Sequence, residues 1–165
     1  FYKRGWRGIN IDALPGSMKV FQKFRPRDIN LELAVSEREQ VLTYYMFNEP
    51  ALNGFSKTIS EKRQTDVYKI TNTKDILAFP LYTILDNHLL LGQSIDFLSV
   101  DVEGLDLQVL ESNDWKKYSP KVILVEILGN RLTTIENDPV YNFMINQGYI
   151  LFAKLVYTCI FKLKE

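Results

Sequence analysis

The stretch "FLSVDVEGLDLQVL", residues 97–110, changes character in its middle. Its first residues belong to the apolar run 95–101, which predicts a buried strand, because strands covered on both faces read as nearly continuous apolar sequence. Two carboxylates, Asp101 and Glu103, follow one residue apart, and Gly104 then opens a helix-like segment. A strand, an acidic turn and a helix in this order predict one unit of an α/β fold.

Segments of strand and helix character continue on both sides of this unit. Strands are predicted at 8–12, 29–35, 41–47, 65–71, 95–101, 121–127, 148–154 and 156–163. Helices are predicted at 15–24, 79–91, 103–115 and 138–147. Because a helix separates 95–101 from 121–127, these strands should be parallel and joined by a right-handed crossover. The last two strands leave no room for a helix, so we expect an antiparallel hairpin at one edge of a mostly parallel sheet.

Strands 41–47 and 65–71 are expected to pair as a β-hairpin with a long tip, inserted at about 41–71. We expect residues 1–165 to form a single domain, because a chain of 165 residues that is 46% hydrophobic can build one proper core.

Charge and composition exclude several classes of protein. Lys plus Arg and Asp plus Glu number 20 each, and this balance argues against a general nucleic-acid binder, although not against a small local patch. The sequence has no apolar run of about 18 residues, so no membrane span is expected. The opening "FYKRGW" lacks the regions of a signal peptide, and Cys159 is expected to be a buried, reduced thiol. These features predict a cytoplasmic protein.

Acidic residues follow several of the predicted strands. Asp12 ends the strand 8–12, Asp101 ends the strand 95–101, Glu126 lies near the end of the strand 121–127, and Ser36 follows the strand 29–35. Ligands of open α/β sheets bind beyond the carboxyl ends of the strands. We therefore expect the acids to line a cleft at one edge of the sheet.

Each acid also has a purely structural interpretation. Asp101 could cap the next helix, Glu103 could favour the helix dipole, and Asp12 could cap the helix 15–24. Glu126 either faces the cleft or pairs with a cation, because an unpartnered buried acid is costly. The position of Asp12 also suits a carboxylate that accepts hydrogen bonds from both hydroxyls of a ribose, although no GxGxxG-like glycine run occurs in the chain.

Four segments together resemble the FkbM-type S-adenosylmethionine-dependent methyltransferases in order and spacing, from about residue 4 to about residue 128. These segments are "GWRGINIDALP", "INLELAVS", "IDFLSVDVEGLDLQVLES" and "PKVILVEI", of which "DFLSVDVEG" is the most specific. The resemblance implies the class I methyltransferase fold, a Rossmann-like sheet whose final strand runs antiparallel. By this comparison, the family's first strand and glycine-rich cofactor loop are expected before residue 1.

The resemblance also assigns roles to the polar residues at the strand ends. It implies that Asp12 holds the adenosyl ribose, and that Asp101 and Glu103 lie beside the methionine end of the cofactor and the acceptor. Glu126 would lie near the acceptor pocket. We therefore expect Asp101, Glu103 and Glu126 to be catalytic, and Asp12, Ser36 and Asp101 to bind S-adenosylmethionine.

The predicted reaction is O-methylation of a hydroxyl on a small molecule or a glycan. Methyl transfer requires alignment of the reactants, and a hydroxyl acceptor benefits from a general base. Asp101, Glu103, Glu126 and His88 are the candidate bases. A metal centre is not expected, because the chain has one histidine and its acids are scattered. Binding of magnesium by Asp101 and Glu103 is the alternative that the sequence leaves.

Two other functions fit parts of the sequence. The chain could be a non-catalytic or truncated methyltransferase-like domain that acts as a binding or interaction module. It could also be another nucleotide-binding α/β enzyme, such as a dehydrogenase, which explains "DVEG" less well. The expected partner is the acceptor, without nucleic acid or membrane. Self-association into a homo-oligomer is a further expectation, because an unpaired central strand would expose a sheet edge.

Overall fold

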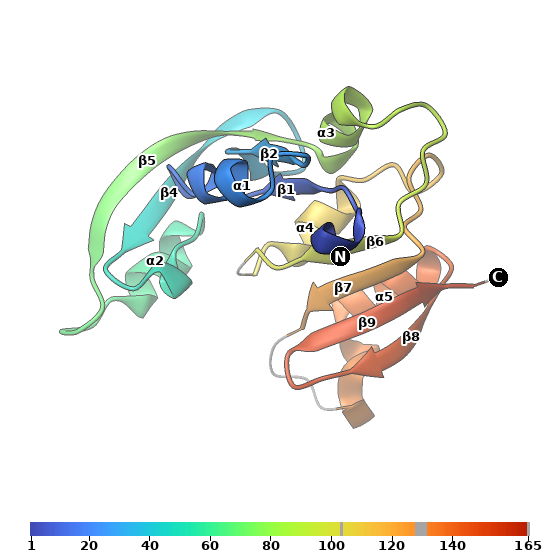
Figure 1. The fold of residues 1–165 in the computed structure, drawn as a ribbon. Coiled ribbons are helices and arrows are strands. Elements are labelled where there is room, and N and C mark those ends of the chain that lie inside the picture. The colour runs from blue at the N-terminus through green and yellow to red at the C-terminus, as the bar shows by residue number, and fades with distance from the viewer. Residues whose placement is uncertain (103, 128–131, 165) are drawn as a thin grey trace. The chain divides into compact units, whose positions relative to one another are not determined.

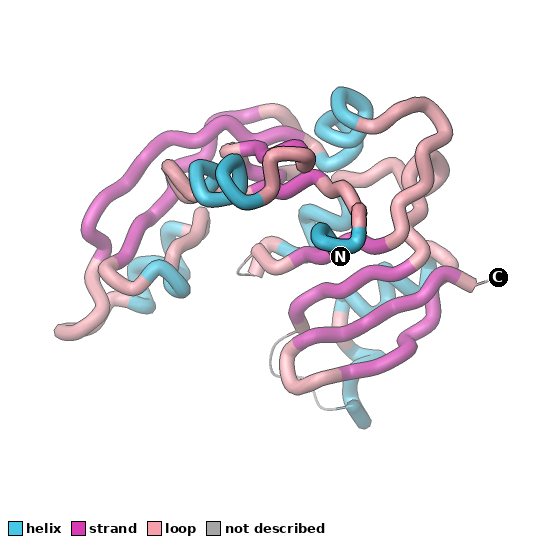
Figure 2. The backbone as a smooth tube through the Cα atoms, in the orientation of Figure 1, coloured by secondary structure: helices cyan, strands magenta, loops and turns pink. Residues whose placement is uncertain are grey.

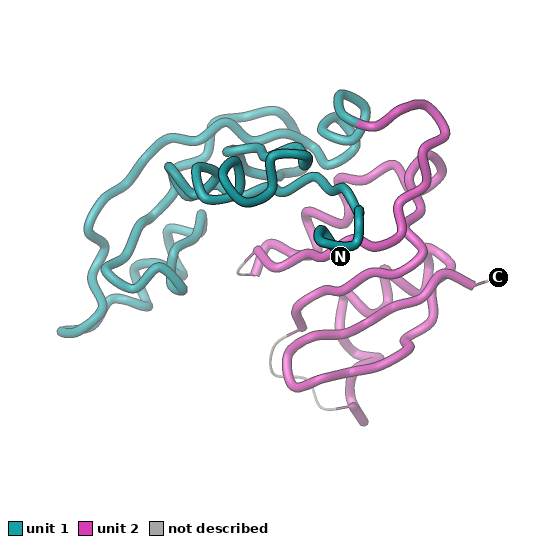
Figure 3. Tube along the Cα trace, viewed as in Figure 1, with its two compact units in different colours: residues 1–88 teal, residues 89–165 magenta. Residues whose placement is uncertain are grey.

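The computed structural model describes residues 1–102, 104–127 and 132–164. The chain divides into two compact units, residues 1–88 and residues 89–165 (Figure 3). Both units mix helices with strands, so the α/β class is confirmed. That residues 1–165 form one domain stays a prediction. Among the described residues, no helix is long and apolar enough to cross a membrane.

The first unit begins with a parallel strand pair. The short 3₁₀ helix η1 (Tyr2–Arg4) precedes β1 (Ile9–Ile11), and helix α1 (Met18–Phe24) connects β1 to β2 (Ile29–Leu31) (Figure 1). The two strands pair in parallel with Ile9 opposite Ile29. The predicted helix is confirmed, and Met18 is buried, but Phe24 is 66% exposed beneath the ammonium group of Lys23. The apolar residues of α1 are therefore not all buried.

A second sheet in this unit contains the predicted hairpin. Its strands are β3 (Ala34–Val35), β4 (Gln40–Phe47) and β5 (Ile70–Phe79), in the order β3-β5-β4. β4 and β5 are antiparallel and form the long curved ribbon visible in Figure 2, and β3 runs parallel to β5. The prediction of a single strand at 29–35 is wrong. These residues form two strands, β2 and β3, which pair in different sheets.

The tip of this hairpin differs from the prediction. The second strand begins at Ile70, because residues 65–68 form a turn in which the Thr65 hydroxyl accepts the N–H groups of Val67 and Tyr68. A local side-chain acceptor of this kind competes with a strand ladder. The tip also contains η2 (Pro50–Leu52) and the unpredicted helix α2 (Lys57–Arg63), whose N-cap Ser56 accepts the N–H of Ile59. Helix α3 (Leu81–His88) follows β5, as predicted within 79–91.

The second unit is built on a four-stranded sheet. Its strands are β6 (Phe97–Val100), β7 (Val122–Glu126), β8 (Tyr149–Lys154) and β9 (Thr158–Leu163), in the order β6-β7-β9-β8. β6 and β7 are parallel, and β9 is antiparallel to both of its neighbours, as the sequence predicts. β6, β7 and β8 consequently point the same way, and their carboxyl ends lie at one edge.

Helices cover one face of this sheet. Helix α4 (Asp106–Glu111) follows β6, and the 3₁₀ helix η3 (Leu132–Asn137) and helix α5 (Pro139–Asn146) follow β7 (Figure 1). Alternate strand residues Ile123, Val125 and Phe161 are fully buried, together with Leu110 of α4 and Met144 of α5, and so is Cys159. Helix α4 is shorter than the predicted 103–115. The core therefore fixes both strands that precede the candidate acids.

Candidate functional site

Asp12 follows the last residue of β1. Its backbone N–H continues the ladder by donating to the Leu31 carbonyl at 3.1 Å, and its Oδ1 accepts the N–H of Leu14 at 2.8 Å. This bond makes a local turn, whereas the N-cap residue of α1 is Ser17, so Asp12 does not cap that helix. Asp12 is half-buried, and no other hydrogen bond to its carboxylate is found within the described part of the chain.

Glu32, which was not predicted as a site residue, supports the same turn from the neighbouring strand. Its Oε2 accepts the N–H of Gly16 at 2.7 Å, and Gly16 has a φ of +84°, which favours glycine. The segment after β1 is thus held by a carboxylate from each strand of the parallel pair. The available signal was the position of Glu32 directly after the apolar residues of β2.

Ser36 follows β3, so it ends a strand of the other sheet in the first unit. Its N–H donates to the Phe79 carbonyl at 3.0 Å, and its buried hydroxyl donates to the Arg38 carbonyl at 2.6 Å. Pairing within a sheet does not bring Ser36 to the edge that Asp12 occupies, because among the described strands β1 pairs with β2 alone. Its role in cofactor binding stays a prediction.

Asp101 and Glu126 lie together at one edge of the four-stranded sheet. β6 and β7 are parallel with Val100 opposite Val125, and the next residues are Asp101 and Glu126. Asp101 is exposed and Glu126 is half-buried. The expectation that these two acids share a strand-end edge is confirmed. Asp12 belongs to the other unit, so its place on the same edge stays a prediction, and Glu103 lies outside the described residues.

The turn after β6 is held by Asp106, which was also not predicted as a site residue. Its carboxylate is buried and accepts two backbone N–H groups, from Val102 to Oδ1 and from Gly104 to Oδ2, each at 3.2 Å. Gly104 has a φ of +91°. The N-cap residue of α4 is Leu105, so Asp101 does not cap this helix, contrary to its structural interpretation.

The pKa of the Asp106 carboxyl is raised. Burial is the main cause and the negative charge of Asp101 adds to it, while the backbone donors oppose the increase. The negative charge of Asp101 therefore acts on Asp106 across this turn. An acid placed directly before the apolar run of a helix was the signal in the sequence.

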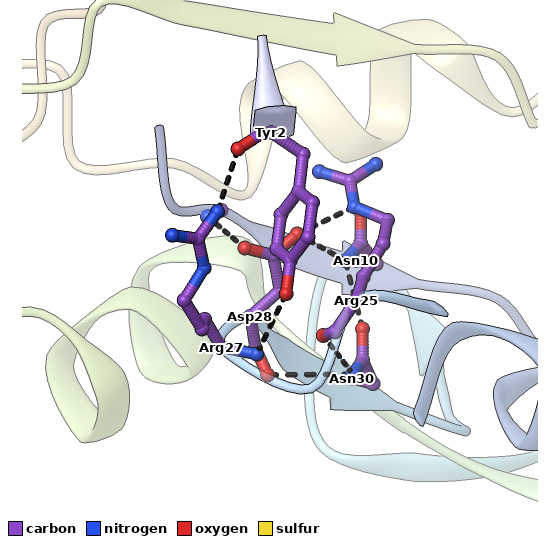
Figure 4. A network of polar contacts seen from close by, with 7 residues as sticks. Tyr2, Asn10, Arg25, Arg27, Asp28 and Asn30 are labelled. Atoms are coloured by element: carbon purple, nitrogen blue, oxygen red, sulfur yellow. Dashed lines mark hydrogen bonds and ion pairs between the residues drawn. The ribbon is translucent and has the colours of Figure 1, made fainter. Parts of the chain in front are cut away.

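Figure 4 shows a polar network that includes Asn10 of β1 and centres on Asp28. The side chain of Asp28 is fully buried. Its carboxylate accepts the Gly8 N–H at 3.0 Å, the Asn10 amide at 3.2 Å and the Arg25 Nε–H at 2.6 Å. Burial alone would raise the pKa of Asp28, but the bonds from Asn10, Gly8 and Arg25, with the Arg25 charge, outweigh it, and the pKa is lowered. Asn10 lies two residues before Asp12, so the network fixes the strand that carries Asp12.

The other candidate residues have structural surroundings. The aromatic residues Tyr44 and Phe47 of β4 are buried, and the Tyr44 ring lies 4.8 Å from the Phe55 ring, so these side chains pack in the core. His88 is the exposed last residue of α3. Burial raises the pKa of the Cys159 thiol, which is free and buried as predicted. Among the described residues, no three His, Cys, Asp or Glu side chains gather as metal ligands do.

Comparison with protein families identifies the chain. The family model described as the methyltransferase FkbM domain matches residues 1–151. This span contains β1 with Asp12, the turn after β6 with Asp101 and Asp106, and β7 with Glu126. No curated protein and no solved structure matches the sequence. Because the match covers most of the 165 residues, the chain belongs to the FkbM methyltransferase family.

Proposed function

We propose that the chain acts in S-adenosylmethionine-dependent O-methylation of a hydroxyl group on a small molecule or a glycan. Membership of the FkbM family supports methyltransferase activity. The observation that carries the proposal is the parallel pairing of β6 and β7, which brings Asp101 and Glu126 to one edge of their sheet. Ligands of such sheets bind at this edge.

The topology supports a Rossmann-like class I methyltransferase sheet. In the second unit the order is β6-β7-β9-β8, and only β9 runs against the other three strands. In the first unit, β1 and β2 form a parallel pair connected through α1. Both arrangements are expected of parts of such a sheet, in which short connections and helical crossovers alternate.

Asp12 suits the ribose of the cofactor. One of its carboxylate oxygens is engaged in the turn to Leu14, and the residue is only half-buried, so the second oxygen can accept a hydrogen bond from a ribose hydroxyl. A carboxylate after a parallel strand is a common partner of the ribose in nucleotide-binding α/β folds. The residues present therefore fit an adenosyl group at this position.

The acids of the second unit suit the acceptor. S-adenosylmethionine, when bound, supplies a methyl group on a positively charged sulfur. As the acceptor oxygen takes the methyl group, the methyl–sulfur bond would break, S-adenosylhomocysteine would leave, and Asp101 or Glu126 would accept the proton of the hydroxyl. A general base of this kind contributes about 10²–10⁴-fold to the rate. The rest of the site must align the two reactants and exclude water.

The substitution Asp12→Asn tests the cofactor site. The asparagine keeps an oxygen for the Leu14 N–H but replaces the second carboxylate oxygen with an amide donor and removes the charge. The dissociation constant for S-adenosylmethionine is expected to rise about 10- to 100-fold, because a hydrogen bond to a charged group contributes about 1.5–3 kcal/mol. Isothermal titration calorimetry measures this change.

The matched control is Asp66→Asn, which alters an exposed aspartate in the turn before β5. It should leave the dissociation constant unchanged. Equal affinities of wild type and Asp12→Asn would remove Asp12 from the cofactor site, and no binding by the wild-type chain would contradict the proposed function itself.

A further inference from the structure

Asp106 binds the backbone on the strand side of its helix. An N-cap side chain accepts N–H groups that lie two or three residues later, inside the helix. The carboxylate of Asp106 instead accepts the N–H groups of Val102 and Gly104, which precede it by four and two residues. These bonds therefore fix the connection between β6 and α4.

These bonds also determine the position of Asp101. The residue before it, Val100, is buried and paired with Val125, and the residue after it, Val102, is held by Asp106. The backbone of Asp101 thus lies between two fixed residues. On the neighbouring strand, the residue beside Asp101 is Glu126, the last residue of β7. A change in the Asp106 bonds would move Asp101 relative to Glu126.

The buried position of Asp106 makes its ionised carboxylate energetically costly. The residue is 6% exposed, and an ionised carboxylate at such a position loses its hydration. Burial and the charge of Asp101 together outweigh the backbone donors, since the pKa of Asp106 is raised. A buried charge that is kept against this cost is expected where the exact position of a turn matters, as at binding and catalytic sites.

We propose that Asp106 is a positioning residue of the methyltransferase site: its carboxylate holds the backbone of Val102 and Gly104 so that Asp101 faces the acceptor beside Glu126. This role rests on the proposed function. Asp106 itself does not touch the reactants, because both of its oxygens are engaged with the backbone and its side chain is buried.

The test is Asp106→Asn, which has nearly the same shape and removes the buried charge. Asparagine has one acceptor oxygen and an amide donor, so it can hold only one of the two N–H groups. We expect kcat to fall about 10- to 100-fold, because small displacements of reacting groups have effects of this size. The dissociation constant for S-adenosylmethionine should change less than threefold, and the midpoint of unfolding should be unchanged or higher.

The matched control is Asp114→Asn. The Oδ1 of Asp114 also accepts two backbone N–H groups, from Lys116 at 3.1 Å and Lys117 at 3.2 Å, but this aspartate is exposed in the turn after α4. Its substitution should leave kcat unchanged. Amide hydrogen exchange on the whole chain gives a direct structural measurement, and exchange at Val102 or Gly104 should become faster in Asp106→Asn alone.

The outcomes separate this role from a structural one and from the proposed function. A loss of kcat together with an equal or higher unfolding midpoint and faster exchange supports positioning. A loss of kcat that accompanies a lower midpoint, or an unchanged kcat despite faster exchange, overturns it. Gly104→Ala provides a second variant, since a φ of +91° strains alanine in the same turn without altering Asp106, and it should lower kcat in the same direction. An inactive wild-type chain would contradict the proposed function instead.

Discussion

Replacing Asp28 with alanine is expected to lower the free energy of unfolding by about 3 kcal/mol, with a range of about 2–5 kcal/mol. The side chain of Asp28 is fully buried, and three donors, from Gly8, Asn10 and Arg25, converge on it. Alanine removes the acceptor of the Gly8 N–H and one of the two acceptors of the Asn10 amide, which keeps its bond to Asn30, and an unsatisfied buried donor costs about 1–3 kcal/mol. The Arg25 side chain is 37% exposed and can return to water, so it adds little to the cost.

The control for this prediction is Asp96→Ala. Asp96 pairs with Lys121 at 2.7 Å, nearly the distance of the Arg25–Asp28 pair, but its side chain is 50% exposed. A surface pair of this kind contributes about 0–1 kcal/mol. Denaturant unfolding of both variants gives the comparison, and similar losses for Asp28→Ala and Asp96→Ala would contradict the importance of burial in the network.

The stability contributed by Asp28 should also depend on pH. Its folded-state pKa is lowered from the ordinary value, so its contribution is fully present above the pKa of the unfolded chain, about 3.9. The contribution is lost as the pH falls through the folded-state pKa. The difference in unfolding free energy between wild type and Asp28→Asn should therefore be constant near neutral pH and shrink below about pH 4. A difference that stays constant down to pH 2 would show that the charge of Asp28 is not involved.

The double variant Asp101→Asn, Glu126→Gln is expected to lower kcat by at least about 10², and up to about 10⁴-fold. Both carboxylates lie at the edge formed by the carboxyl ends of β6 and β7, and the amides that replace them cannot accept a proton from a hydroxyl at neutral pH. The dissociation constant for S-adenosylmethionine should change little. The measurement is formation of S-adenosylhomocysteine with a panel of small alcohols and glycans as acceptors.

The single variants identify the base. The acid that takes the proton should account for most of the loss by itself, whereas the other should alter mainly the Michaelis constant for the acceptor. Glu111→Gln, at the exposed end of α4, is the control and should keep the wild-type rate. A double variant within about threefold of wild type would show that neither acid acts as a base.

The strands of the second unit were predictable because their signals are local. The apolar runs at 95–101 and 121–127, separated by a helix, were sufficient to predict that β6 and β7 pair in parallel. The short gap before 156–163 was sufficient for the β8–β9 hairpin. Their register then placed Asp101 beside Glu126, since residues of neighbouring strands meet in order.

The predictions failed where a distant or a very short contact decides the structure. The division of 29–35 into β2 and β3 depends on partners about 20 residues earlier and more than 40 residues later, which the alternation of 29–35 does not reveal. The late start of β5 depends on one threonine hydroxyl. Asp28 looks like an ordinary surface acid in the sequence, and the position of Asp106 before an apolar run indicates only a helix start; the burial of both residues shows what they hold.

The position of β9 has a consequence for the biogenesis of the protein. β9 is the later strand of its hairpin, yet it lies inside the sheet, between β7 and β8. Among the described strands, β8 is therefore connected to the rest of the sheet through its pairing with β9. On the ribosome, β8 therefore emerges without a strand to join, and the second unit cannot close until residue 163 has left the exit tunnel. Folding of this unit follows synthesis of its last strand, and until then the side of β7 that pairs with β9 lacks its partner strand.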